Sequence, residues 1–152
     1  MMRHRPFDVW VLSQSILMLL LLVAGPWFPA DWHFDYGWAT GAFLFFGAGA
    51  LGLAGVRHLG RDRTASPHPK PGSQLVQRGV YAYCRHPLYA SLWLAGAGWA
   101  CLWQNAPTLV LALAQIPFFV VKARVEERLL RQVFPEYENY AKRVKRFIPG
   151  VF

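Results

Sequence analysis

Residues 37–56 read GWATGAFLFFGAGALGLAGV, twenty consecutive positions without a charged side chain. A helix of about 20 mostly apolar residues is long enough to cross roughly 30 Å of hydrocarbon, so this stretch predicts a transmembrane helix. Its many glycine and alanine residues allow helix backbones to approach closely in lipid, which indicates a helix that packs against others. The stretch therefore favours an all-α membrane protein.

Three further apolar stretches extend the prediction to four spans. Val9 to Phe28 is equally long and uncharged, whereas Leu88 to Trp103 and Pro107 to Val121 are shorter but can each be extended by a helical turn into a polar flank. The composition agrees with a membrane protein, because 55% of the 152 residues are hydrophobic and the mean hydropathy is +0.22. We expect one domain, residues 1–152, with four spans.

The basic residues predict an orientation for these spans. Of the 16 Lys and Arg residues, two precede the first span, six lie between the second and the third, and eight follow the fourth. Because cytoplasmic loops are enriched in Lys and Arg, we expect both termini to be cytoplasmic. The net charge of +8 then indicates contact with anionic lipid head groups, and its distribution by topology argues against nucleic acid as a partner.

Other features argue against a cleaved leader, a disulfide and a metal site. Pro26, Trp27 and Phe28 stand where a signal peptide would have small residues before its cleavage site, so we expect the first helix to be retained. Cys84 and Cys101 would lie about 25 Å apart along a helix, too far for a disulfide. The five histidines lack the paired spacing of zinc ligands, and we expect no bound metal.

A charged and aromatic stretch, RGVYAYCRHPLYASLW at residues 78–93, runs directly into the third span. Pro87 disfavours the helical conformation for the residue before it, so we expect His86 as the cap and Pro87 in the first turn. The free N–H groups of such a helix N-terminus bind a carboxylate or phosphate. Aromatic surface for a flat ring would come from Tyr81, Tyr83 and Tyr89. Alternatively, Arg85 and these tyrosines form an interfacial anchor.

Two more polar segments lie on the same predicted side of the membrane. The loop at residues 57–79 is longer than a tight helical hairpin requires, and long structured loops are often functional. After the fourth span, a helix is predicted in which Lys122 with Glu126, and Glu127 with Arg131, are spaced as i, i+4 ion pairs. Solvated ion pairs are the usual meaning of that pattern. However, two carboxylates close to the bilayer on a basic surface also suit a cationic ligand.

Two sequence blocks together resemble a known family. SQLVQRGVYAYCRHPLYAS (residues 73–91) followed by EERLLRQVFPEYENYAKRV (residues 126–144) is similar to the isoprenylcysteine carboxyl methyltransferase and phospholipid methyltransferase superfamily. Its members are small polytopic membrane enzymes that use S-adenosylmethionine, and the resemblance covers roughly residues 57–149. It implies a lipophilic substrate that enters from the bilayer. The implied cofactor-binding positions are Ser73, Gln74, Leu75, Val76, Tyr81, His86, Pro87, Leu88, Tyr89 and Glu126.

The sequence departs from the family pattern at three places. Lys122 stands where the family has a substrate-binding Arg, and it supplies a point charge in place of a bidentate fork. The resemblance implies that Lys122 orients the substrate. Ser91 replaces the Gly of RHPxYxG, and its side chain leaves less room for another backbone to approach closely at this position. FPEY is one residue shorter than the usual FGxxY, which reshapes a loop.

This modest set of residues agrees with methyl transfer from a sulfonium, because the protein mainly has to position the reactants and exclude water and needs no nucleophilic side chain. A carboxylate acceptor needs no base, and Lys122 would orient it, whereas an amine acceptor needs a base such as Glu126, Glu127 or His86. We expect methylation of a carboxylate on a prenylated or similarly hydrophobic molecule. Phospholipid amine N-methylation is the alternative within the family, and a non-catalytic membrane protein that binds lipid or a partner is the alternative outside it.

Overall fold

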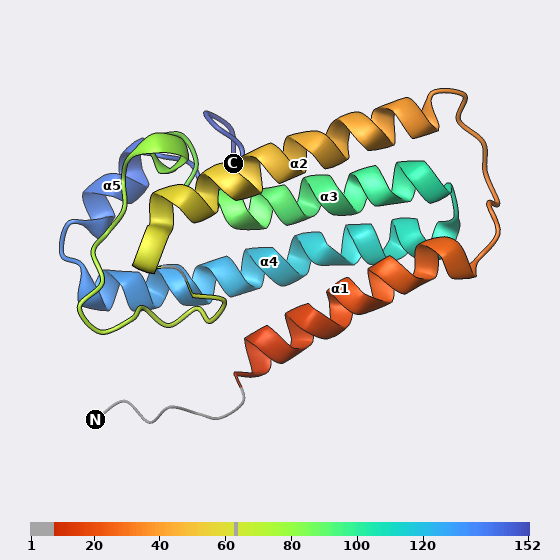
Figure 1. Cartoon of the computed structure of the whole chain (residues 1–152). Coiled ribbons are helices and arrows are strands. Elements are labelled where there is room, and N and C mark those ends of the chain that lie inside the picture. Colours follow the sequence, from red (N-terminus) through yellow and green to blue (C-terminus); the bar gives the residue numbers. More distant parts are fainter. Residues whose placement is uncertain (1–7, 63) are drawn as a thin grey trace.

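The computed structural model describes residues 8–62 and 64–152, and its regular elements there are helices (Figure 1). Four long helices lie side by side and a short fifth one packs at one end, which confirms the predicted all-α fold. Within the described residues, the only strand-like pairing is an isolated bridge between Cys84 and Lys145. The helices are α1 (Val9–Trp27), α2 (Gly37–Leu59), α3 (Pro87–Trp103), α4 (Ala106–Val133) and α5 (Tyr137–Arg143), with 3-10 helices η1 (Gly60–Asp62) and η2 (Gly79–Ala82) between α2 and α3.

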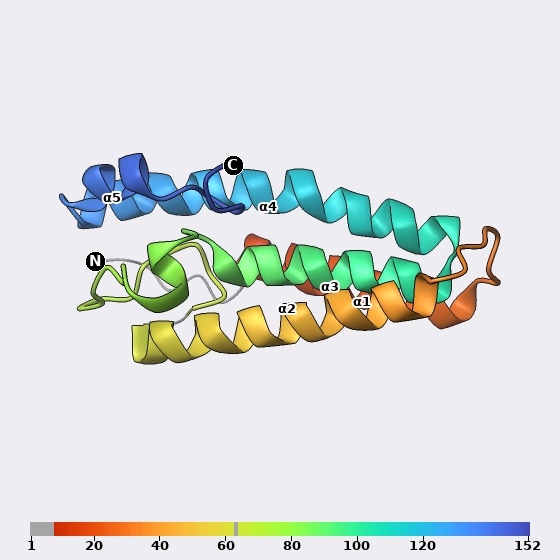
Figure 2. The ribbon, with the colours of Figure 1, turned by 90° about the horizontal axis from the view of Figure 1, so that it is seen from above.

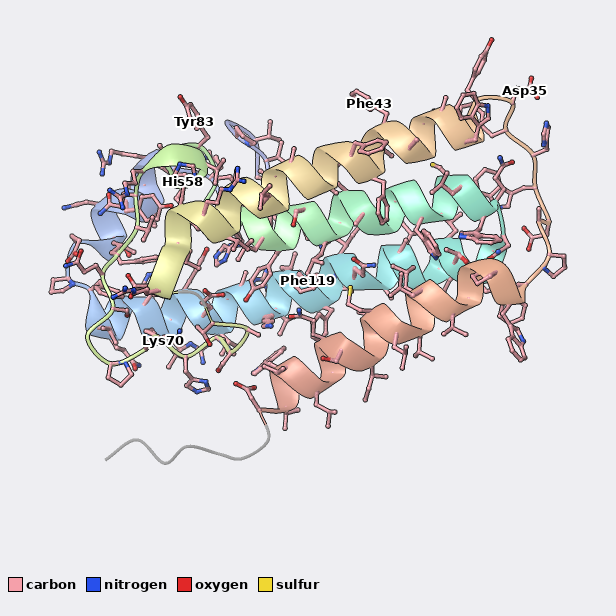
Figure 3. All side chains as sticks on the ribbon, in the orientation of Figure 1. Asp35, Phe43, His58, Lys70, Tyr83 and Phe119 are labelled. Atoms are coloured by element: carbon pink, nitrogen blue, oxygen red, sulfur yellow. The ribbon has the colours of Figure 1, made fainter. Side chains whose placement is uncertain are left out.

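Three of these helices are long and apolar enough to cross a membrane: α1, α2 together with η1, and α4. Large apolar side chains such as Leu19, Phe43 and Val110 are exposed on their outer surfaces, and Phe43 points away from the bundle in Figure 3. α3 has 17 residues, about 25 Å at 1.5 Å per residue, and packs alongside the other three. A fourth span is consistent with this arrangement and stays a prediction for α3.

The boundaries of α3 and α4 follow from the local sequence. α3 begins with Pro87 at its first helical position, and His86 before it is non-helical with φ −124° and ψ 60°, as predicted. It ends at Trp103, and its C-cap residue Gln104 has a φ of 51°, which lies in the left-handed region. Asn105 then caps α4, because its side-chain oxygen accepts hydrogen bonds from the Thr108 N–H at 3.0 Å and the Thr108 hydroxyl at 2.6 Å. A two-residue connection makes α3 and α4 antiparallel neighbours.

α3 lies between the other long helices and packs most extensively against α2. The closest approach involves Gly41 and Gly98, since a Cβ atom on either one would lie 2.8 Å from the carbonyl oxygen of the other. A Cβ atom on Gly47 or Gly49 would meet nothing within 4 Å. The predicted role of small residues in close helix packing is therefore confirmed for one face of α2 only.

The polar segments gather at one end of the bundle, which is called the polar end below. The loop between α2 and α3, the C-terminal part of α4, and α5 all lie there, whereas residues 28–36 and 104–105 lie at the opposite end (Figures 1 and 2). The fourth predicted span and the polar helix after it form one continuous helix. α4 does not stop at Val121, the predicted end of the span, but continues to Val133. This segregation agrees with the charge pattern, and the side of the membrane that the polar end faces stays a prediction.

Candidate active site

A cavity that is partly open to solvent lies at the polar end. Its walls come from the loop between α2 and α3, the start of α3, the C-terminal part of α4, and α5. Nine of the ten implied cofactor positions line it, and the tenth, Pro87, is fully buried in the first turn of α3. The nine are Ser73, Gln74, Leu75, Val76, Tyr81, His86, Leu88, Tyr89 and Glu126.

One wall of the cavity is formed by residues 73–76 of the loop between α2 and α3. Residues 73–76 belong to no helix or strand, and the Ser73 N–H donates a hydrogen bond to the Lys70 carbonyl oxygen at 3.1 Å. The backbone N–H groups of Leu75 and Val76 have no hydrogen-bond partner within residues 8–62 and 64–152. Leu75 and Val76 are half-buried and line the cavity, so these N–H groups are available to pair with a polar ligand edge.

The same loop is tied to the start of α1. The Ser66 hydroxyl donates a hydrogen bond to one carboxylate oxygen of Asp8, and the other oxygen accepts the N–H of Trp10 at 2.9 Å as the N-cap of α1. His68, which lines the cavity, lies 3.6 Å from Asp8 and 2.9 Å from the Ser66 hydroxyl. The position of this cavity wall therefore depends on α1.

Lys122 does not line the cavity. Its side chain is fully buried between α1, α4 and the loop, where Nζ donates hydrogen bonds to the Gln14 side-chain oxygen and, at 2.8 Å, to the Ala65 carbonyl oxygen. Nζ also lies 5.3 Å from the centre of the Tyr89 ring. The predicted ion pair with Glu126 is wrong, because the ammonium group turns toward α1 instead of along its own helix. The predicted role of Lys122 in orienting a substrate stays a prediction.

Glu126 faces the cavity and is held by two neighbours from α3. The Tyr89 hydroxyl donates a 2.6 Å hydrogen bond to Glu126 Oε2, and His86 Nδ1 lies 3.7 Å from the same oxygen. His86 stacks on one face of the Tyr89 ring and Phe119 lies against the ring as well; Phe119 lies between α3 and α4 in Figure 3. The predicted aromatic surface is thus only partly available, and Tyr83 is 70% exposed and points away from the bundle.

Glu127 lies at the centre of a buried ion-pair network. One of its oxygens accepts a hydrogen bond from Arg85 at 2.9 Å, and both accept from Arg146, at 2.9 and 2.7 Å. His86 Nε2 lies 3.1 Å from the same carboxylate, whose side chain is only 1% exposed. The predicted pair with Arg131 is wrong, since Arg131 binds a carboxylate of α5 instead. With both oxygens occupied, Glu127 is bound within the protein and is not offered to a ligand.

The C-terminal segment fixes the residues that precede α3. The N–H groups of Arg85 and His86 donate to the carbonyl oxygens of Lys145 and Arg146, each at 2.9 Å. The Arg85 guanidinium also donates to the carbonyl oxygens of Ala141 and Val144. The start of α3 is therefore ordered by residues about 60 positions away. Sequence reasoning missed Arg146, because one more Arg in a basic tail carries no signal of its partner.

Burial controls the protonation of side chains around η2. It raises the pKa of Tyr81 well above the usual range, and the Glu126 charge raises it further. It also raises the pKa of the Cys84 thiol to about 11. Tyr81 and Cys84 are therefore neutral at physiological pH, and Cys84 is a structural thiol and not a nucleophile. The Tyr140 hydroxyl, which donates to the Tyr81 carbonyl oxygen at 2.6 Å, links α5 to η2.

Two departures from the family pattern lie in different places. Ser91 is buried in the contact between α2 and α3 and does not line the cavity; its hydroxyl donates to the Leu88 carbonyl oxygen at 2.7 Å, and it faces Gly52. The FPEY segment forms the turn from α4 to α5 and places Phe134 and Tyr137 in the cavity wall. These two aromatic residues were not predicted as site residues, although the quoted block contains both.

Negative and positive charges lie at different places around the cavity. Glu126 presents a carboxylate near Tyr89. Arg85 and Arg146 carry two positive charges and share the one negative charge of Glu127, which leaves one positive charge in excess. Arg85 lines the cavity as well. The arrangement can accept a ligand that carries both a cationic and an anionic group.

The family model described as phospholipid methyltransferase matches residues 36–137, about two-thirds of the chain. The chain therefore belongs to the phospholipid methyltransferase family. The matched range includes α2, α3, α4 and the loop that lines the cavity.

Among its relatives is the cobalt-zinc-cadmium resistance protein CzcN of Cupriavidus metallidurans, 34% identical over 149 residues, which are 97% of this chain and 64% of that protein. The nickel-cobalt-cadmium resistance protein NccN of Alcaligenes xylosoxydans xylosoxydans is 29% identical over 148 residues, 97% of this chain and 65% of that protein. The chain thus spans slightly less than two-thirds of either relative. Within the described part of the chain, no group of three or more His, Cys, Asp or Glu is placed to hold a metal ion.

A third relative has a named enzymatic activity. The protein-S-isoprenylcysteine O-methyltransferase of Schizosaccharomyces pombe is 38% identical over 77 residues, which are 49% of this chain and 33% of that enzyme.

Proposed function

We propose that this protein transfers a methyl group from S-adenosylmethionine to a lipophilic or membrane-associated acceptor. The main support is the cavity, in which nine of the ten positions implied by the resemblance lie together although they come from separate segments. Membership of the phospholipid methyltransferase family and the likeness to the S. pombe isoprenylcysteine methyltransferase support the same activity.

The residues around the cavity fit the groups that S-adenosylmethionine carries. Glu126, whose side chain is 25% exposed, suits a cationic centre. Arg85 Nε and the Tyr137 hydroxyl are buried without a hydrogen-bond partner among the described residues, and both residues line the cavity. Two such donors suit a carboxylate. The backbone N–H groups of Leu75 and Val76, which have no hydrogen-bond partner among the described residues, suit the edge of a purine.

When bound, S-adenosylmethionine supplies a methyl group that its sulfonium has already activated. The chain then has to position the reactants and exclude water, which requires no nucleophilic side chain. Tyr89 and His86 hold the Glu126 carboxylate in one orientation. Leu130 and Phe134 supply apolar surface to the cavity wall.

A carboxylate on a prenylated or similarly hydrophobic molecule is the first candidate acceptor, since it attacks without a base. Lys122, a buried cation one helical turn from Glu126, supports this choice. Phospholipid amine N-methylation is the second candidate. For that reaction Glu127 is already bound by two arginines, which leaves Glu126 and His86 as bases.

Cofactor binding is tested by calorimetry on the purified chain in detergent, with S-adenosylmethionine and S-adenosylhomocysteine. We expect Glu126→Gln to weaken binding by about ten- to a hundredfold, the effect of losing one charge-assisted hydrogen bond. Glu136→Gln is the matched control, because Glu136 is exposed in the turn between α4 and α5 and does not line the cavity. Absence of heat from the folded wild-type chain would favour a non-catalytic lipid- or partner-binding protein.

The acceptor is tested by the chemical stability of the transferred methyl group. The chain in nanodiscs is incubated with methyl-labelled S-adenosylmethionine and either N-acetyl-S-farnesylcysteine or phosphatidylethanolamine. A methyl ester releases volatile methanol in base, whereas an N-methyl group is stable. Base-labile label on farnesylcysteine supports the carboxylate, and base-stable label on the phospholipid supports the amine.

A further inference from the structure

Residues 147–152, called the apolar turn below, follow α5 and carry an exposed apolar surface. In Figures 1 and 2 the chain runs back from α5 to a position beside the start of α3. Phe147 is buried there, with its ring centre 4.3 Å from that of Trp93. The other large side chains of the turn are Ile148, Val151 and Phe152, which are 50%, 73% and 44% exposed. No described part of the protein covers this surface.

Trp93 fixes the level of the apolar turn along the bundle. Its Nε1 donates a hydrogen bond of 3.3 Å to the carbonyl oxygen of Gln115. Gln115 lies six residues before Val121, the predicted end of the apolar part of α4, or about 9 Å inside that part at 1.5 Å per residue. Because Phe147 packs on Trp93, the apolar turn lies at the border of the apolar region and not out in the aqueous layer.

The backbone of the apolar turn is largely satisfied from within. Gly150, after Pro149, has a φ of 76° and reverses the chain. The N–H groups of Val151 and Phe152 donate to the Ile148 carbonyl oxygen, each at 3.1 Å, and those of Phe147 and Ile148 donate to the Phe152 carbonyl oxygen, each at 2.6 Å. Four of the five backbone N–H groups are thus paired inside the turn. Since unpaired backbone groups are costly in lipid, this pairing makes contact with acyl chains possible.

Basic side chains precede the apolar turn. Lys142, Arg143 and Lys145 are exposed, and none of them forms an ion pair within the described part of the chain. Basic residues next to exposed apolar ones are typical of segments that bind at the surface of an anionic membrane. A second copy of this chain would bring the same positive charge, so the charge pattern favours lipid as the partner.

We propose that the apolar turn inserts into the boundary between the head groups and the acyl chains of the membrane that holds the bundle. The inference goes beyond the proposed function and needs only that the bundle spans a bilayer. Arg146, directly before the turn, binds both oxygens of Glu127, and its carbonyl oxygen accepts the N–H of His86. Insertion of the turn therefore holds the C-terminal segment against the residues that precede α3.

Spin labels measure this contact with lipid. A nitroxide is attached to Val151→Cys in the full chain, with Cys101→Ser as background and the buried Cys84 retained, in nanodiscs that contain anionic lipid. Collisions with oxygen, which dissolves in acyl chains, are compared with collisions with a water-soluble nickel chelate. Asn139→Cys is the matched control on the exposed surface of α5, and Phe43→Cys marks the outer surface of α2, where Phe43 is 78% exposed.

We expect the label at Val151 to collide more often with oxygen than with the chelate, as at Phe43, and the label at Asn139 to show the reverse. A label at Val151 that behaves like the one at Asn139 would overturn the inference. Few collisions with either reagent would mean that protein, such as a second copy of the chain, covers the turn, and would overturn it as well. Ile148→Cys gives the same measurement if Val151→Cys does not fold.

A charge placed in the apolar turn tests whether its apolar side chains cause the insertion. Ile148→Asp, combined with the label at Val151, should shift the collisions of that label from oxygen toward the chelate, because a carboxylate is costly among acyl chains. Asn139→Asp adds the same charge to α5 and should leave the label at Val151 unchanged. An unchanged oxygen preference in Ile148→Asp would overturn the anchoring role of these side chains.

Discussion

Replacing Glu127 by Gln tests whether the buried ion-pair network holds the polar end together. The substitution keeps the size of the side chain and one acceptor oxygen but removes the charge that two arginines share. The side chains of Glu127, Arg85 and Arg146 are 1%, 10% and 21% exposed, respectively. Both arginines would then be left without an anion in a poorly solvated place, which is the situation in which breaking an ion pair costs most.

The expected loss follows from this burial. Removing one partner of a fully buried ion pair costs roughly 3–5 kcal/mol. The lower end applies here, because Arg146 is partly solvated and Arg85 keeps its hydrogen bonds to the carbonyl oxygens of Ala141 and Val144. We expect the free energy of unfolding to fall by about 3 kcal/mol. At about 2–4 °C per kcal/mol for a chain of this length, Tm should fall by roughly 6–12 °C.

The assay is thermal unfolding of the purified chain in one detergent, followed by intrinsic tryptophan fluorescence. Glu138→Gln is the matched control, because it removes one charge from a solvated pair with Arg131 in which the two side chains are 56% and 44% exposed. We expect the control to unfold at the wild-type temperature within error, since exposed pairs contribute little. Equal Tm values for Glu127→Gln and Glu138→Gln would refute the structural role of the network.

Two further predictions concern the bundle. Gly41→Ala should lower the free energy of unfolding by about 1–3 kcal/mol, because its Cβ would lie 2.8 Å from the Gly98 carbonyl oxygen. The control Gly47→Ala places its Cβ in open space and should not destabilise the chain. Equal effects of the two substitutions in unfolding experiments would contradict the packing of α2 on α3. Cysteines introduced at Asp35 and Lys142 should react with a membrane-impermeant maleimide from opposite sides of the membrane, and labelling of both from one side would exclude the predicted even number of spans.

The helices and one of their boundaries could be predicted because their causes are local. Length and absence of charge predicted α1 and α2, and the effect of Pro87 on His86 predicted where α3 begins. Charge segregation predicted that the polar segments share one end of the bundle. The resemblance supplied nine residues that line one cavity, which periodicity alone would not have selected from a loop.

The side-chain partners at the polar end could not be predicted, because they depend on distant segments. The i, i+4 rule pairs Lys122 with Glu126 and Glu127 with Arg131, but it applies to solvated helices in isolation. Here the C-terminal segment brings Arg146 to Glu127, and α1 brings Gln14 to Lys122. These contacts span 19 and 108 positions in the sequence, so no local pattern indicates them.

Both of those distant partners lie outside residues 36–137, the range that the family model matches. The matched range supplies most of the cavity wall, including its loop, α3 and α4. The flanking segments contribute contacts around this wall: Arg146 binds both oxygens of Glu127, and Gln14 accepts a hydrogen bond from the buried Lys122. A change in α1 can therefore affect both the loop wall, through the contacts of Asp8 with Ser66 and His68, and the buried Lys122, through Gln14. Substitutions outside the matched range therefore act on the site through the residues that support it, since neither Gln14 nor Arg146 lines the cavity.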